Sequence, residues 1–117
     1  MRLDYDLIRE LLLTIERFSD IEKNLSSEWI SRQCTASNDN GVILYHLKFL
    51  ADADYIELDN GNLLAVSDIT PAGRAYLDSI RTQRMWDKVK SEVNKNLLPL
   101  SLDIIKLTAL ELIKKVL

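Results

Sequence analysis

Few side chains in this sequence could carry chemistry, and their spacing assembles no catalytic or metal site. His46 is the only histidine and Cys34 the only cysteine, 12 residues apart, whereas a structural zinc site needs four such ligands. Cys34 has no basic neighbour except Arg32 and no second histidine to activate it as a nucleophile. The three glycines are isolated and form no phosphate-binding loop. We therefore expect a protein that is not an enzyme and that holds no metal or cofactor.

Length and composition predict a single soluble domain. The 117 residues are 47% hydrophobic and 28% charged, which suffices for one globular core. The longest apolar runs, Leu11–Leu13 and Val42–Tyr45, are far too short to cross a bilayer. The acidic, periodic N-terminus is unlike a secretory signal, and a lone cysteine fits a reducing compartment. We expect a cytoplasmic protein without a membrane segment.

Charge is distributed unevenly along the chain. Residues 1–80 carry 7 basic and 14 acidic side chains, a balance of -7, and residues 81–117 carry 8 and 4, a balance of +4. Nucleic-acid binders gather basic residues on the face that docks. The basic C-terminal third fits that pattern. The uneven charge is explained equally well if both parts of the chain simply have charged, solvated faces.

Hydrophobic periodicity places the first elements. Apolar residues recur at helical spacing over residues 4–18, and Asp4 can cap that helix. Leu25–Gln33 has the features of a brief strand. Thr35–Gly41 is a turn cluster, after which Asn38 or Asp39 caps a helix that runs to about Ala53.

A hairpin and three further helices complete the order. Asp59-Asn60-Gly61-Asn62 between two apolar runs is a strong hairpin signal. Thr70-Pro71 then opens a helix through Ile80. The last two helices are expected at Arg84–Asn96 and from Ser101 to the C-terminus.

This order predicts an α+β, winged-helix-like domain over residues 1–80, with the hairpin as the wing. Residues 81–117 would form extra C-terminal helices that pack on it or mediate dimerisation. A helix-turn-helix also needs a short helix before the recognition helix. Only Arg32–Asn38 is free for it, so that helix is expected to be degenerate or absent.

Three stretches together resemble a known family. They are MRLDYDLIRELLLTIE at the start, YHLKFLADADYIE at 45–57 and ITPAGRAYLDSIRTQRMWDKVK at 69–90. In this order they resemble an uncharacterised family of bacterial and phage proteins, known only as a domain of unknown function. The middle block also resembles winged-helix repressors. The resemblance implies a fold and a phage or prophage association, but no activity.

The chain departs from that family at two places. Its members usually carry Gly then Leu where this chain has Asp54 and Tyr55. A helix end often needs a left-handed backbone, which Gly adopts more easily than Asp does. The aromatic residue usual before the family's glycine is also absent, since Pro71-Ala72 precedes Gly73.

The predicted recognition helix supports the first of two functional hypotheses, a phage-related DNA-binding regulator. Its core side would carry Ile43, Leu47, Leu50 and Ala51. Polar side chains on the other side can meet bases and phosphates of double-stranded DNA. The candidate groove residues are Asn38, Asn40, Tyr45 and Lys48. The candidate phosphate contacts are Arg81, Arg84 and Lys88, from a basic helical stripe opposite Trp86, Val89 and Val93. Arg81 belongs to this stripe unless Arg81-Thr82-Gln83 breaks the helix from its predecessor.

The second hypothesis is an adaptor or inhibitor that binds a host or phage protein. Leu44 and Tyr45 would form the centre of that contact, since exposed Leu and Tyr are common in interface cores. The wing carries Glu57 and Asp59 but no Lys or Arg, and phosphates repel such a surface. DNA binding is ranked first because most winged-helix domains bind nucleic acids, which is an argument from fold alone.

The final helix is unusually apolar and predicts a homodimer. Ten of the 16 residues in 102–117 are hydrophobic, and Ile104 and Leu107 fall outside the main apolar arc. Symmetric dimers commonly bury such a surplus. The alternative is that both residues pack under Trp86 within one chain.

Overall fold

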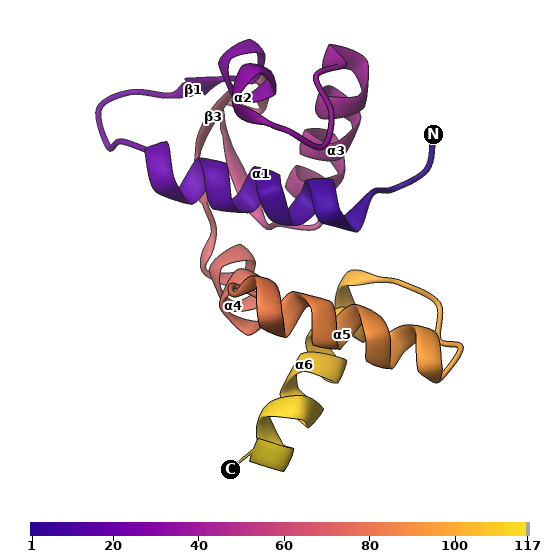
Figure 1. Cartoon of the computed structure of the whole chain (residues 1–117). Coiled ribbons are helices and arrows are strands. Elements are labelled where there is room, and N and C mark those ends of the chain that lie inside the picture. Colours follow the sequence, from indigo (N-terminus) through magenta and orange to yellow (C-terminus); the bar gives the residue numbers. More distant parts are fainter. Residues whose placement is uncertain (117) are drawn as a thin grey trace. The chain divides into compact units, whose positions relative to one another are not determined.

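The computed structural model describes residues 1–116, which form six helices and three short strands (Figure 1). The elements are α1 (Tyr5–Phe18), β1 (Leu25–Ser26), α2 (Ser27–Gln33), α3 (Asn40–Asp52), β2 (Ile56–Asp59), β3 (Asn62–Ile69), α4 (Pro71–Ser79), α5 (Gln83–Lys95) and α6 (Leu102–Val116). Within the described residues, every helix is too short or too polar to span a bilayer.

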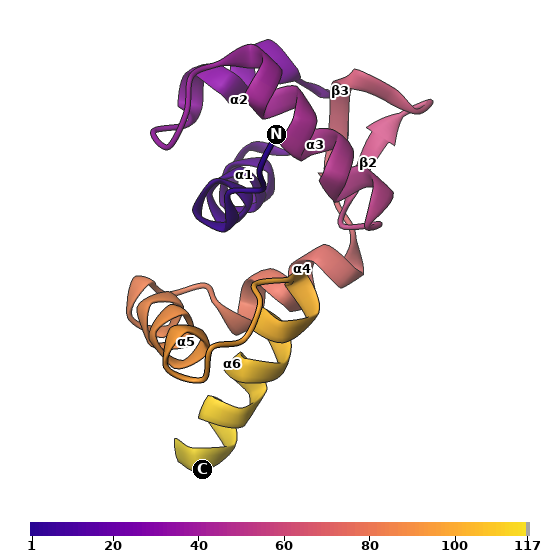
Figure 2. The same cartoon turned by 90° about the vertical axis from the view of Figure 1, so that its right-hand side faces the viewer.

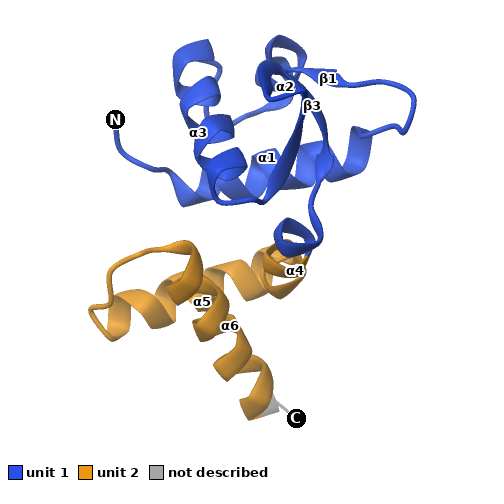
Figure 3. Ribbon diagram, turned by 180° about the vertical axis from the view of Figure 1, so that it is seen from behind, with its two compact units in different colours: residues 1–74 blue, residues 75–117 orange. Residues whose placement is uncertain are grey.

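The chain divides into two compact units, shown in blue and orange in Figure 3. Unit 1 is Met1–Arg74 and unit 2 is Ala75–Leu117. The division falls inside α4, six residues before the boundary that the sequence suggested.

Unit 1 has the architecture of a winged helix. Its antiparallel sheet has the order β1-β3-β2, with Leu25 opposite Val66 and Ile56 opposite Ile69. α1, α2 and α3 contact one another and β3, on one side of this sheet (Figure 2). The predicted α+β, winged-helix-like fold is therefore confirmed, and the β2–β3 hairpin is the wing.

The core of unit 1 is built on the apolar stripe of α1. Asp4 starts this helix because its carboxylate accepts hydrogen bonds from the backbone N–H groups of Asp6 and Leu7. The stripe meets aliphatic residues of α2, α3 and β3, all without solvent exposure. The core residues are Leu7, Ile8, Leu11, Leu12, Ile15, Ile30, Ile43, Leu47, Leu50 and Val66.

The short helix before the recognition helix, expected at Arg32–Asn38 and there degenerate or absent, is present earlier in the chain as α2, at Ser27–Gln33. The expected strand over Leu25–Gln33 is wrong beyond Ser26, because the Ser26 hydroxyl caps a helix by accepting from the N–H of Trp29 at 3.1 Å. Ser27, Ile30 and Ser31 are buried at helical spacing. With two of these three residues being serine, the apolar periodicity was too weak to reveal the helix.

The wing turn follows its sequence signal closely. Asn60 and Gly61 both have positive φ, 51° and 74°, and Asp59 lies opposite Asn62. Two consecutive left-handed residues are the requirement of the tight hairpin turn that Asn-Gly favours.

The end of α3 forces an aspartate into a left-handed conformation. The N–H of Tyr55 donates to the Leu50 carbonyl at 2.8 Å and the N–H of Asp54 to the Ala51 carbonyl at 3.0 Å. These two bonds close the helix in a Schellman motif, whose C′ residue is ordinarily glycine. Asp54 occupies that position with φ 62°, so the missing glycine strains the backbone at the helix end and leaves the fold intact.

Asp54→Gly is therefore expected to raise the free energy of unfolding by about 0.5–1 kcal/mol, because glycine adopts this conformation without a steric penalty. Urea denaturation of the two proteins measures the difference. Ala53→Gly is the matched control, since Ala53 has a right-handed backbone with φ -80°. That neighbouring change should destabilise the protein. A loss of stability in Asp54→Gly would contradict the strain argument.

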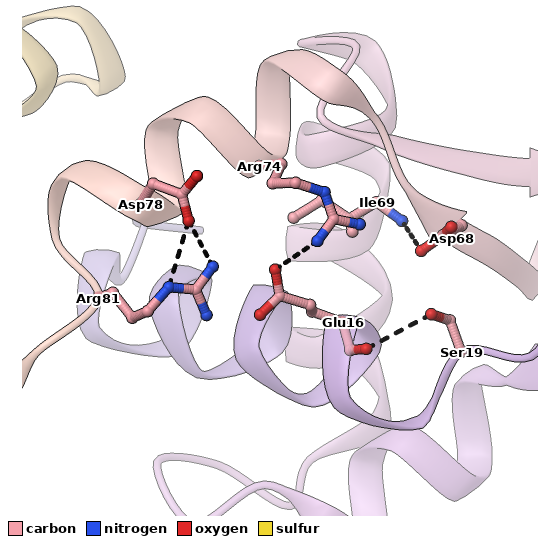
Figure 4. Close-up of polar contacts among 7 residues, drawn as sticks. All are labelled: Glu16, Ser19, Asp68, Ile69, Arg74, Asp78 and Arg81. Carbon is pink, nitrogen blue, oxygen red and sulfur yellow. Dashed lines mark hydrogen bonds and ion pairs between the residues drawn. The ribbon is translucent and has the colours of Figure 1, made fainter.

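α4 begins against the connection between α3 and β2. Thr70 donates its N–H to the Tyr55 carbonyl at 3.0 Å and its hydroxyl to the Asp54 carbonyl at 2.6 Å. The same hydroxyl accepts from the N–H of Gly73 at 3.0 Å. Figure 4 shows the guanidinium of Arg74 paired with Glu16 of α1 at 2.7 Å, which fixes the start of α4 within unit 1.

Unit 2 packs α5 against α6 (Figure 2). α5 buries Trp86, Val89 and Val93, and α6 buries Ile105 and Ala109.

A second Schellman motif closes α5. The N–H of Leu97 donates to the Asn94 carbonyl and that of Leu98 to the Val93 carbonyl, both at 3.1 Å. Here the left-handed residue is Leu97, with φ 55° and a side chain that is 91% exposed.

Candidate interface on the third helix and the wing

The turn between α2 and α3 is held by a carboxylate from α1. Glu10 accepts hydrogen bonds from the N–H and hydroxyl of Thr35 and from the N–H of Ala36. Two backbone donors that a loop would otherwise leave to water are thereby satisfied. No signal in the sequence indicates this role of Glu10, because Glu10 and Thr35 lie 25 positions apart and their contact has no local pattern.

Two further hydrogen-bond sets fix the entry into α3. Ser31 donates its hydroxyl to the Asn38 carbonyl at 3.4 Å. The Asp39 carboxylate accepts from the N–H groups of Gly41 and Val42 at 2.8 and 3.3 Å. Of the two predicted caps, Asp39 is therefore the one used. With Glu10, these contacts give α3 a defined orientation on the surface of unit 1.

His46 joins α3 to the start of α1. It is buried, its Nε2 accepts from the N–H of Asp4 at 2.9 Å, and its Nδ1 lies 2.8 Å from the Val42 carbonyl. A carbonyl only accepts, so the proton sits on Nδ1. The imidazole is committed on both sides to backbone groups and faces the core.

The outer side of α3 carries the predicted groove residues. Asn38, Asn40, Tyr45 and Lys48 are all exposed, Tyr45 at 37%, and they follow one another along the turn and the helix. Leu44, the other predicted interface residue here, is half-buried between them. The predicted inward residues Ile43, Leu47 and Leu50 are fully buried, and Ala51 is half-buried.

The charge of this side is neutralised within the helix itself. Lys48 is the one Lys or Arg of α3, and its Nζ lies 2.8 Å from Asp52 Oδ2 in an exposed ion pair. The hydrogen bond and the charge of Asp52 raise the pKa of Lys48. Lys48 thus remains a cation, but one whose field is largely cancelled by its neighbour.

The wing adds negative charge beside α3. Glu57 and Asp59 are exposed on β2. An open recess of about 350 Å³ also lies against the wing, lined by Ser19, Asp20, Ile21, Asn24, Glu57, Ser67 and Asp68. Its three carboxylates come from segments far apart in the sequence, so no sequence motif indicates this recess. The described residues contain no cluster of three His, Cys, Asp or Glu arranged for a metal ion.

The predicted phosphate contacts belong to unit 2 and are not equivalent. Arg81 precedes α5, because Thr82 caps that helix. Its guanidinium binds Asp78 through Nε at 3.2 Å and through a terminal nitrogen at 2.5 Å (Figure 4). Arg84 and Lys88 are exposed on α5, opposite its buried residues. The basic stripe of α5 therefore begins at Arg84, because residues 80–82 separate α5 from α4, the alternative that the sequence left open.

The two residues predicted to lie in a dimer interface, Ile104 and Leu107, differ in their exposure to solvent. Ile104 is half-buried, whereas Leu107 is 58% exposed. The alternative that both residues pack inside the chain under Trp86 is wrong for Leu107.

Cys34 lies next to the Glu10 contact and is buried. Burial, together with the charge and hydrogen bonding of Glu10, raises the pKa of its thiol from 9.0 to about 12. Only the thiolate is an effective nucleophile, so the folded protein holds this cysteine in its unreactive form.

We therefore expect iodoacetamide at pH 8 to leave Cys34 of the folded protein unmodified and to alkylate it fully in urea, as read by intact-mass spectrometry. Between pH 9 and about 12 the unfolded thiol is ionised while the folded one stays protonated. The unfolded state then binds fewer protons, so stability falls as pH rises. Cys34→Ala should flatten that decline. Rapid alkylation of the folded protein would contradict the assignment.

Taken together, the fold and its surface define a winged-helix-like protein whose third helix has one exposed side with polar residues and whose wing is acidic. Residues 2–98 match the family described as "Hypothetical protein (DUF2513)", and the chain belongs to this family. It is also similar to an uncharacterized protein of Haemophilus influenzae (strain ATCC 51907 / DSM 11121 / KW20 / Rd), 33% identical over 122 residues that cover 100% of this chain and 99% of the relative. No solved structure matches the chain.

Proposed function

We propose that the protein is a phage- or prophage-related transcriptional regulator of the cytoplasm, which binds double-stranded DNA and carries out no catalysis. The observation that supports this most is the complete helix-turn-helix. α2, a turn fixed by Glu10, and α3 with its exposed polar side occupy the arrangement that presents a helix to the major groove.

Each candidate residue has a chemical role in that complex. Asn38 and Asn40 lie at the start of α3, where amides can bond an adenine edge. Tyr45 and Lys48 lie further along and would contact the phosphate backbone. For Lys48 this means leaving Asp52, a small cost because both side chains are 66% exposed and surface pairs are weak. Arg84 and Lys88 would add phosphate contacts from unit 2, with Arg81 exchanging Asp78 for a phosphate.

A second candidate function is an adaptor or inhibitor that binds a host or phage protein. It is favoured by the Lys48–Asp52 pair and by the carboxylates of the wing, which reduce attraction to phosphates. In this case Tyr45 and Leu44 would be the centre of the contact, since tyrosine is enriched among residues that dominate binding energy.

Fluorescence anisotropy of a labelled random-sequence duplex tests the first proposal. The purified protein should bind at low salt and release the duplex as salt rises. Lys48→Glu should abolish binding. Lys23→Glu, the same charge change in unit 1 outside α3 and the wing, should leave most of it. Asp52→Asn should tighten binding, because it frees the cation of Lys48.

Absence of binding even at low salt would reject the DNA proposal and leave the adaptor. The adaptor predicts the opposite ranking of variants. A protein retained by the immobilised chain would be lost with Tyr45→Ala and kept with Lys48→Glu.

A further inference from the structure

The outer side of α6 exposes two leucines that its own unit does not cover. α6 turns Ile105, Thr108 and Ala109 inward, where they are buried. Leu107 and Leu110 lie on the opposite side of the helix and are 58% and 42% exposed. Contiguous exposed apolar side chains are a feature of interaction surfaces.

Two opposite charges bracket these leucines. Asp103 lies four residues before Leu107, and Lys114 lies four residues after Leu110. The spacing of four, three and four residues keeps all of them on one stripe, the repeat by which two helices form a seam. We call Asp103, Leu107, Leu110 and Lys114 the α6 stripe. Lys114 makes a long contact of 3.8 Å with Glu111, which is exposed and lies beside the stripe.

We propose that the α6 stripe pairs with the same stripe of a second copy of the chain, with the two helices antiparallel. A two-fold axis perpendicular to the two helices, at the level midway between Thr108 and Ala109, sets Leu107 against the partner's Leu110. The same axis sets Asp103 against the partner's Lys114, and by symmetry Lys114 against the partner's Asp103. One operation therefore joins both apolar residues and both charges.

The order of charges selects this arrangement over the alternative. In a parallel pair of α6 helices, Asp103 would face the partner's Asp103 and Lys114 the partner's Lys114, and like charges across a seam repel. The antiparallel pair converts both contacts into attractions. A surface that is complementary to itself in this way is what a two-fold dimer interface requires. The proposal stands independently of DNA binding, because it concerns unit 2 alone.

Sedimentation velocity of the full chain over a concentration series, without DNA, tests the pairing. The wild-type protein is expected to move as a dimer at the upper concentrations. Leu110→Glu should weaken dimerisation at least about tenfold, since it places a charge in the seam. Leu98→Glu is the matched control, because Leu98 is 43% exposed and lies outside the stripe. A monomeric wild-type protein, or a dimer unaffected by Leu110→Glu, would overturn the proposal.

Charge reversal tests the antiparallel register. Asp103→Lys and Lys114→Asp should each weaken the dimer, and the double variant should restore it because opposite charges again face each other. Lys115→Asp makes the same charge change next to the stripe and should have little effect. Circular dichroism checks that each variant keeps its helices. Failure of the folded double variant to recover dimerisation would overturn this register.

Discussion

Replacing Gly73 by alanine is expected to lower the free energy of unfolding by about 3 kcal/mol, the upper range for overpacking a buried site. A Cβ built on Gly73 would lie 2.2 Å from the Tyr55 carbonyl oxygen and 2.9 Å from Cγ1 of Ile69. The carbonyl is backbone and already accepts from the N–H of Thr70 at 3.0 Å, so it cannot move aside cheaply. The start of α4 would have to lift from the α3–β2 connection.

The sign of this effect distinguishes packing from helix propensity. Glycine to alanine within a helix ordinarily stabilises a protein by about 0.5–1 kcal/mol. Gly41→Ala is the matched control, because its Cβ would meet only the Asp39 carboxylate, at 3.2 Å, and the net change there should be near zero. Urea denaturation of both variants provides the comparison. Equal stabilities for Gly73→Ala and the wild-type protein would show that α4 is not pressed against Tyr55.

His46→Ala is expected to cost a similar amount, about 3 kcal/mol, since it empties a buried site and removes a hydrogen-bond acceptor. The N–H of Asp4 would lose its bond to Nε2, and Asp4 is the residue that caps α1. The loss should therefore appear both in global unfolding and as faster hydrogen exchange at the first turn of α1.

Two variants separate the parts of that loss. His46→Phe keeps a buried ring but no acceptor, and should destabilise the protein by about 1 kcal/mol, the cost of losing one hydrogen bond in a part-buried place. His46→Gln keeps an acceptor of similar reach and should restore slower exchange at the start of α1. Nitrogen NMR of the wild-type imidazole should find the proton on Nδ1. A His46→Phe variant as stable as the wild type would show that the hydrogen bond from the Asp4 N–H to His46 contributes nothing to stability.

Local signals allowed much of this fold to be predicted. Asp4, the Asn60-Gly61 pair and Thr70-Pro71 each act on the few residues that follow them, and each produced the expected helix start or turn. α2 was missed because its burial depends on two serines, and a serine is polar in any pattern whether or not the fold encloses it.

The candidate surface was predictable in part for the same reason. The inward and outward sides of α3 follow from helical spacing, and the structure confirms Ile43, Leu47 and Leu50 as core. The pairing of Lys48 with Asp52 has the i, i+4 spacing of a helical ion pair, and the sequence held that signal too. The Glu10–Thr35 contact could not be predicted, because it exists only once α1 and the turn are packed together.

The leucine that closes α5 bears on how this chain would respond to laboratory evolution. Leu97 combines a left-handed backbone with a side chain almost wholly in water, so Leu97→Gly removes a steric cost and an exposed apolar group together. A library selected only for survival after heating should enrich that change early, with a gain of about 1 kcal/mol. A library selected for partner binding instead would retain Leu97 if the α5–α6 turn takes part in recognition. Comparing the residue at position 97 in the two enriched pools would show whether the α5–α6 turn belongs to the surface that binds the partner.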